Sequence, residues 1–266
     1  MNIKILTITG AILLLLLASG TASAASTKVL IVSTDPNVGV VKTYLQNFPD
    51  ISSVDTFNAG IHPFIAGASY VPTLSYLQAY DVVLVYSSMS YYDTVALGNV
   101  LADYVDVGGH VVVATNSFSS GGRLEGRFEG PAGGYAPLFQ ASYQFDNPYS
   151  PSTSGWYDLG NLIMTGVGPI SGYYRGAAAL TNGATLVASW AENKPFVATK
   201  GNVVGIALYP GKYSNSYDWT GNVPLLLHNA LVVGRTPDTS IPEFPSVVLP
   251  VVAIMGLMFV FDRRKM

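Results

Sequence analysis

Three short segments of this chain are almost unbroken runs of apolar residues. They are residues 28–33, 81–86 and 110–115. A strand with one face in the core alternates apolar and polar residues, whereas a continuous apolar run predicts a strand that is buried on both faces. Such strands need a covering layer on each side of their sheet. This feature therefore restricts the chain to a sheet packed between helices.

Helical patterns separate these strands. Apolar residues recur at helical spacing after Asp35-Pro36-Asn37, a shorter pattern follows later, and a third, amphipathic pattern stops at a pair of glycines. The expected helices span residues 35–48, 73–79 and 94–107, and a weaker strand is expected at 54–57. Strands that alternate with helices predict the α/β class, with a doubly wound, mostly parallel sheet and helices on both faces.

The second half of the chain has a different pattern. Residues 184–191, 194–200 and 202–209 predict strands joined by hairpins, and residues 222–233 predict a closing helix. Residues 119–151 are rich in Gly, Pro, Tyr and Phe and lack periodicity. A loop of that length inside a compact domain is usually functional or an inserted cap.

The N-terminal 25 residues read as a secretory signal peptide. Lys4 precedes an apolar run over 5–18, and Ala22-Ser23-Ala24 forms the small-residue pattern that a signal peptidase requires. Cleavage is expected after Ala24 or Ala25. An uncleaved anchor helix is the alternative.

The C-terminus combines a short motif, an apolar stretch and a basic tip. The motif is Pro242-Glu243-Phe244, residues 247–261 are a candidate transmembrane segment, and the chain closes with Arg263-Arg264-Lys265-Met266. Basic residues stay on the cytoplasmic side, which leaves the preceding chain outside the cell. The arrangement resembles the PEF-CTERM sorting signal of archaeal surface proteins. That resemblance implies processing by an archaeosortase and a lipid anchor on the mature protein; a plain transmembrane anchor is the alternative.

These signals divide the chain into four parts: a signal peptide at 1–25, an α/β domain at 26–234, a linker at 235–240 and the sorting signal at 241–266. Only 11% of the residues are charged, the formal net charge is −3, and there is no cysteine. The absence of cysteine excludes disulfides, thiolate metal sites and cysteine nucleophiles. The absence of a basic patch argues against nucleic acid as a partner.

Two phrases in the domain resemble the class I glutamine amidotransferase-like fold. They are Tyr80-Asp81-Val82-Val83-Leu84-Val85 and Leu101-Ala102-Asp103-Tyr104-Val105-Asp106-Val107-Gly108-Gly109. In that family a Tyr-Asp strand precedes a helix that ends in Gly-Gly, and the next strand delivers the nucleophile. The resemblance implies the same fold for residues 26–234.

The catalytic set that the resemblance implies is missing. Thr115-Asn116-Ser117-Phe118 stands where the family has its cysteine, and the family's Gly-x-x-x-His-Pro-Glu motif is matched by a segment that ends in Tyr209-Pro210-Gly211. The cysteine, the histidine and the glutamate of the family's catalytic set are therefore absent from the matching positions, which excludes glutamine hydrolysis by that mechanism.

No other catalytic constellation is evident. Ser117 and Ser119 lack the G-x-S-x-G elbow, and the histidines show no zinc spacing. Loop aspartates such as Asp35, Asp93 and Asp218 are expected to cap turns rather than to hold a cation. We therefore expect no metal and no cofactor.

Two groups of residues remain as candidate contacts. The first is a polar rim at the carboxyl ends of the strands, where open α/β sheets bind ligands. It comprises Thr34, Asp35, Ser87, Ser88, Asn116, Ser117 and Arg123, which are otherwise ordinary strand-end turn residues. The second group is aromatic and comprises Tyr173, Tyr174 and Trp219, which suit contacts with glycans or other envelope proteins or simply cover the surface.

The sequence thus predicts an exported archaeal protein that is anchored at the outer face of the cell membrane. Its domain is expected to bind a ligand or to serve envelope architecture without catalysis. The alternative is an extracellular hydrolase or carbohydrate-processing enzyme that uses Ser117 or a carboxylate such as Asp35 or Asp93. Signal peptidase, an archaeosortase-like enzyme and the membrane are the expected partners.

Overall fold

The computed structural model describes residues 26–60, 70–119, 123–129, 134–140, 152–175, 177–212 and 218–233. The predicted signal peptide at 1–25, the linker at 235–240 and the sorting signal at 241–266 lie outside these residues. The predicted transmembrane segment at 247–261 lies outside them as well. Within the described part, no helix is both long enough and apolar enough to cross a membrane.

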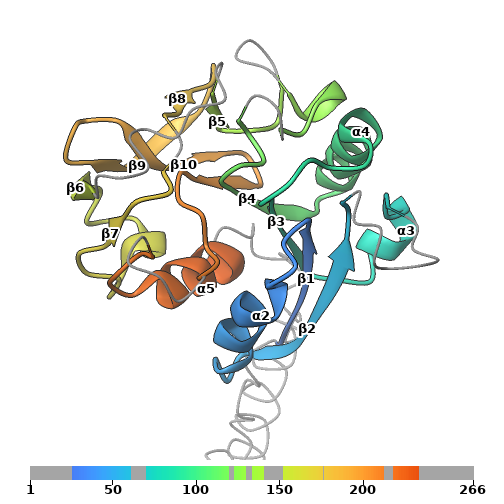
Figure 1. Cartoon of the computed structure of the whole chain (residues 1–266), viewed down its shortest axis with the longest axis horizontal. Coiled ribbons are helices and arrows are strands. Elements are labelled where there is room, and N and C mark those ends of the chain that lie inside the picture. The colour runs from blue at the N-terminus through green and yellow to red at the C-terminus, as the bar shows by residue number, and fades with distance from the viewer. Residues whose placement is uncertain are drawn as a thin grey trace, which may run out of the picture.

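The domain is built on a nine-stranded mixed sheet with the strand order β2-β1-β3-β4-β11-β10-β9-β6-β7 (Figure 1). A separate two-stranded sheet pairs β5 with β8. The strands of the large sheet are β1 (Thr27–Ser33), β2 (Ile51–Asn58), β3 (Val82–Tyr86), β4 (His110–Ala114), β6 (Ser152–Tyr157), β7 (Ser171–Gly172), β9 (Thr185–Trp190), β10 (Pro195–Lys200) and β11 (Val203–Ile206). Those of the small sheet are β5 (Leu138–Phe139) and β8 (Ala179–Leu180).

The first five strands of that order are parallel, and all of them except the edge strand β2 are buried on both faces. β3 and β4 are buried at every position, as their continuous apolar runs predicted. Neighbouring residues of β1 serve opposite layers: Ile31 belongs to one core, and Leu30 and Val32 belong to the other. The sheet therefore separates two hydrophobic layers.

Helices cover both faces of this parallel part. On one face α2 (Val38–Gln46) and α5 (Val223–Val233) pack on the first layer, and on the other face α3 (Leu74–Leu77) and α4 (Thr94–Asp106) pack on the second (Figure 1). The short helices η1 (Gly126–Phe128) and η2 (Leu162–Met164) extend these two layers. Both described parts of the 119–151 segment contribute buried residues to the second layer, among them Phe128 and Leu138.

The predicted doubly wound, mostly parallel sheet is wrong. Four of the eight pairings between described strands of the large sheet are parallel, and the other four, from β11 to β7, are antiparallel. The described residues contain four α-helices against nine strands in this sheet, which makes the domain richer in strands than the predicted class. The predicted hairpins make the pairings of β9, β10 and β11 antiparallel, and β6 and β7, which no sequence pattern predicted, add two further antiparallel pairings.

The packing of α4 depends on one glycine. Gly98 is buried in the middle of this helix, and a Cβ atom at this position would collide with the backbone carbonyl of Glu125. A backbone atom cannot move aside as the end of a side chain can. The segment that precedes η1 thus lies against α4 only because residue 98 has no side chain.

We expect Gly98→Ala to lower the free energy of unfolding by about 1–3 kcal/mol, the usual cost of overpacking. Urea unfolding of the full chain in detergent, followed by tryptophan fluorescence, measures this change. Gly39→Ala is the matched control, because Gly39 also lies in a helix, α2, but nothing lies within 4 Å of its added Cβ. The control should stay within about 0.5 kcal/mol of the parent chain. Equal effects of the two substitutions would show that the close approach to Glu125 is unimportant.

Candidate functional site

The predicted rim residues from three strands lie at one edge of the sheet. Asp35 follows β1, Ser87 follows β3, and Asn116 and Ser117 follow β4, all at the carboxyl ends of parallel neighbours. The Nδ2 of Asn116 donates to the carbonyl of Ser87 at 3.1 Å. The side chain of Thr34 joins the same edge, because its Oγ1 donates to Met89 O at 2.9 Å. The rim residues Ser88 and Arg123 are half-buried, and the other five are at most 8% exposed.

A buried hydrogen bond between Asp35 and Tyr209 joins the two ends of the domain sequence at this rim. Tyr209 follows β11, and its hydroxyl donates to Oδ2 of Asp35 at 2.5 Å. Both residues are 5% exposed. The second carboxylate oxygen of Asp35 accepts the backbone N–H of Asn37 at 2.9 Å, which shapes the turn into α2. The Asp35 carboxylate therefore fixes both the turn into α2 and the side chain of Tyr209.

Two aromatic rings pack against the ring of Tyr209. Its ring meets that of Tyr86 edge to face, with 5.8 Å between the centroids, and that of Tyr174 in the same manner at 6.4 Å. The backbone N–H of Tyr209 also donates to the carbonyl of Tyr174 at 2.9 Å. The structure thus places one of the predicted aromatic contacts directly beside the predicted polar rim.

A second buried hydrogen bond, between two hydroxyls, lies close to the end of β4. The hydroxyls of Ser117 and Tyr91 are 2.5 Å apart, and both residues are buried. Burial raises the pKa of the Tyr91 phenol, an effect that its hydrogen bonds to Ser117 and Ser87 only partly offset. The phenol therefore stays protonated at neutral pH and offers Ser117 a hydroxyl in place of a base.

The two histidines within the described residues lie at the opposite end of the sheet. His110 begins β4, and its ring nitrogens contact the carbonyls of Asn202 at 2.7 Å and Ala230 at 2.8 Å. His228 contacts the Asp50 carboxylate at 2.8 Å, just before β2 begins. Neither ring can serve as a base for Ser117, which lies where β4 ends. His62 is outside the described residues.

Arg123, the predicted cationic member of the rim, is engaged locally. Its guanidinium forms an ion pair with Glu129 at 2.7 Å and lies 5.2 Å from the centroid of the Phe139 ring. A paired, half-buried arginine offers little free positive charge to an anionic ligand. Asp93, a carboxylate of the alternative enzymatic reading, accepts the N–H of Ala96 at 2.8 Å and caps α4.

No cluster of three or more His, Asp or Glu side chains suited to a metal ion occurs among the described residues. The rim chemistry accordingly consists of hydroxyls, amides and one carboxylate. Such groups can donate and accept hydrogen bonds to a polar ligand. With Ser117 paired to a neutral phenol, the described rim contains no activated serine.

The predicted aromatic contacts differ in accessibility. Tyr173 and Tyr174 are half-buried and keep part of each ring exposed. Trp219 is only 6% exposed: its Nε1 donates to the carbonyls of Pro210 and Gly211, each at 3.1 Å, and Lys212 lies 3.9 Å from the ring centroid. Trp219 thus packs beneath the segment that carries Tyr209.

The sequence pattern did not predict the partner of Asp35, which is Tyr209, or the partner of Ser117, which is Tyr91. The sequence marks Tyr209 only as the replacement of a catalytic histidine, and it gives Tyr91 no role. The position of Tyr209 after the strand that pairs with β4 could have indicated a rim residue, because the carboxyl ends of parallel strands meet. Nothing in the sequence pattern indicated that Tyr91 meets Ser117.

We expect Tyr209→Phe to lower the free energy of unfolding by about 1–3 kcal/mol, because it removes a donor from the buried carboxylate of Asp35. Denaturant unfolding of the full chain in detergent measures the loss. Tyr92→Phe is the control, since Tyr92 is 57% exposed and its hydroxyl should contribute little. A double-mutant cycle with Asp35→Asn should give a coupling of at least about 0.5 kcal/mol. Additive effects would contradict a direct interaction.

Residues 241–265 match the family model of the PEF-CTERM archaeal protein sorting domain. The match contains the predicted motif residues Pro242, Glu243 and Phe244, which lie outside the described residues, and it confirms the predicted sorting signal. The chain is therefore exported and anchored at the cell surface. PEF-CTERM domains are processed by archaeosortase-like enzymes and end up associated with the membrane.

Two solved structures share the fold of the domain. One is a cytoplasmic protein, STM3548, from Salmonella typhimurium, with 11% identity, a TM-score of 0.53, and coverage of 76% of this chain and 97% of that chain. The other is a putative ThuA-like protein from Bacteroides uniformis, with 13% identity, a TM-score of 0.51, and coverage of 80% and 93%. At these identities the likeness shows the fold alone. No family match supports the resemblance to glutamine amidotransferases, and no curated protein matches the chain.

Proposed function

We propose that the domain of this anchored surface protein is a non-catalytic binding domain for a neutral, polar ligand. The observation that carries the proposal is that the Ser117 and Tyr209 hydroxyls are engaged with a phenol and a carboxylate, and that neither histidine of the described residues lies beside them. Ser117 is paired with Tyr91 at 2.5 Å, and Tyr209 is paired with Asp35 at 2.5 Å. Groups held in this way are suited to stable hydrogen bonding rather than to proton transfer.

The position of Tyr174 supports a single binding surface. Its ring packs against Tyr209, which is itself bonded to Asp35, so the aromatic segment and the polar rim are neighbours. Rigid rings beside small polar groups supply contact area together with hydrogen bonds. This combination suits the faces and hydroxyls of a glycan, which we take as the ligand class. A neighbouring envelope protein is the alternative partner.

The competing function is that of an extracellular hydrolase or carbohydrate-processing enzyme with a non-standard site. The feature most compatible with it is the Tyr209–Asp35 pair, because a carboxylate can polarise a phenol. Both oxygens of the Asp35 carboxylate already accept a hydrogen bond, however, one from the Tyr209 hydroxyl and one from the N–H of Asn37, which leaves this carboxylate poorly placed to accept a substrate proton.

We expect the full-length chain in detergent to hydrolyse amide, ester and glycoside substrates no faster than the background. Ser117→Ala and Asp35→Asn should leave these rates unchanged. Chromogenic and reducing-end assays measure them. Hydrolysis above background that Ser117→Ala or Asp35→Asn abolishes would refute the proposal and favour the hydrolase.

We expect Tyr173→Ala to weaken glycan binding by at least about tenfold, equivalent to about 1.4 kcal/mol, because it removes a half-buried ring next to Tyr174, whose ring packs against Tyr209. A glycan array followed by titration of the best ligand measures the affinity. Tyr76→Ala is the control, because Tyr76 is 40% exposed but lies on α3, on the opposite face of the sheet. Equal losses for both variants would place the ligand elsewhere.

A further inference from the structure

Three large apolar side chains are exposed close together in sequence, at and after the end of β6. Trp156 is 55% exposed, Leu159 is 86% exposed and Leu162 is 61% exposed. We call these three residues the apolar tip. Leu159 is the most exposed large hydrophobic residue of the described chain. Three large apolar side chains this exposed within seven residues are candidates for a contact with a protein or a membrane.

The apolar tip is held outward by a structured turn. The N–H of Asp158 donates to Val187 O at 2.9 Å, and the Asp158 carboxylate accepts the N–H of Gly160 at 2.9 Å. Asn161 then caps η2 by accepting the N–H of Ile163 at 3.0 Å. Ile163 is 2% exposed and anchors the turn in the core, while Leu159 and Leu162 stay outside. Their exposure is therefore part of the folded structure.

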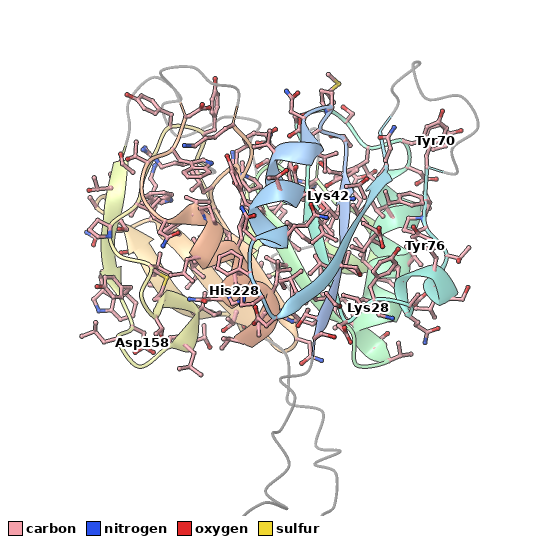
Figure 2. All side chains as sticks on the ribbon, turned by 90° about the horizontal axis from the view of Figure 1, so that it is seen from below. Lys28, Lys42, Tyr70, Tyr76, Asp158 and His228 are labelled. Atoms are coloured by element: carbon pink, nitrogen blue, oxygen red, sulfur yellow. The ribbon has the colours of Figure 1, made fainter. Side chains whose placement is uncertain are left out.

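Strand directions place the apolar tip at the amino end of the parallel strands. β9 is antiparallel to β10, which is antiparallel to β11, so β9 runs in the same direction as the parallel strands. β6 runs against β9, and it therefore begins near the rim and ends at the opposite edge. In Figure 2, Asp158 and Lys28, the latter near the start of β1, are both labelled along the lower edge of the domain.

The last helix ends at the same edge. The Nδ2 of Asn229 on α5 donates to Ile163 O at 3.1 Å and to Thr165 O at 2.9 Å, which ties the helix to the turn of the apolar tip. The carbonyl of Ala230 contacts the ring of His110, the first residue of β4. α5 ends at Val233, less than two helical turns beyond Asn229. The chain thus leaves the domain beside the apolar tip.

Only residues 234–240 separate this helix from the sorting domain at 241–265. Seven residues span at most about 25 Å even when fully extended. While the sorting segment is attached to the membrane, the edge of the domain that carries Val233 and the apolar tip must stay close to the lipid surface. The rim, at the other ends of the strands, then points away from it.

We propose that the apolar tip inserts into the interfacial layer of the membrane that holds the C-terminal anchor. Tryptophan favours this layer because its ring is apolar and its N–H can still reach water or headgroups. Leu159 and Leu162 add apolar area without a buried polar group. The Asp158 carboxylate bonds within its own turn and stays at the polar level. The insertion fixes the orientation of the domain and presents the rim outward.

The test uses the full chain reconstituted into vesicles whose lipids carry bromine on the acyl chains. Trp190 and Trp219, the other two tryptophans, are 1% and 6% exposed and lie inside the domain, so quenching by lipid reports mainly on Trp156. We expect brominated lipid to quench the emission relative to unbrominated vesicles. Trp156→Phe should abolish the quenching, and the pair Leu159→Ser and Leu162→Ser should reduce it by at least about half.

Met89→Ser is the matched control, because Met89 is 49% exposed but lies after β3, at the rim. It should leave the quenching unchanged. Three results would overturn the proposal: an emission that brominated lipid does not quench, quenching that survives Trp156→Phe, or equal losses for the Met89 and leucine variants. Cross-linking that captures two copies joined through the apolar tip, without quenching, would show that a second chain covers it instead.

Discussion

The pairing of β11 with β4 is the constraint on which the rest of the domain depends. β11 lies parallel to β4 along one edge, with Val203 opposite Val111 and Ile206 opposite Ala114, and antiparallel to β10 along the other. This single four-residue strand therefore joins the parallel half of the sheet to the antiparallel half. A Cβ at Gly205 would come within 3.0 Å of Pro137 and Leu138, so the same strand also fixes how closely the β5 segment can pack. The direction of β11 decides that Tyr209 emerges at the rim.

Local pattern predicted the parallel half of the fold well. The apolar runs at 28–33, 81–86 and 110–115 became β1, β3 and β4, and the expected helix at 94–107 became α4 at 94–106. These elements are predictable because both faces of their strands are buried, which leaves an unbroken apolar run in the sequence. The hairpin strands near 184–209 were also expected. They continue the parallel strands into one sheet together with β6 and β7, which the sequence pattern did not predict, and the fold class changes as a result.

The candidate site was predictable only in part, and the reason is physical. Asp35, Ser87, Asn116 and Ser117 were identified because strand ends can be read from the chain, and the structure brings them to one edge. The hydrogen bonds that define their chemistry join residues far apart in sequence, and Asp35 and Tyr209 are 174 positions apart. Such contacts depend on the packing of β11 and of the loop before α4. Residue type and spacing alone do not predict that packing.

The two ends of the parallel strands carry chemically different groups, and the chain leaves the domain toward its membrane anchor at one of these two ends. The carboxyl ends carry hydroxyls, an amide and a carboxylate, whereas the amino ends carry the engaged histidines, the end of α5 and the apolar tip. A tether of seven residues keeps the exit point of the chain within about 25 Å of the sorting domain. With the apolar tip inserted as proposed, the polar rim faces the cell exterior, where an exported protein meets soluble or wall-bound ligands. The low charge of the chain, at 11%, fits such a surface, because tyrosine, serine and asparagine then supply its polar contacts in place of ion pairs.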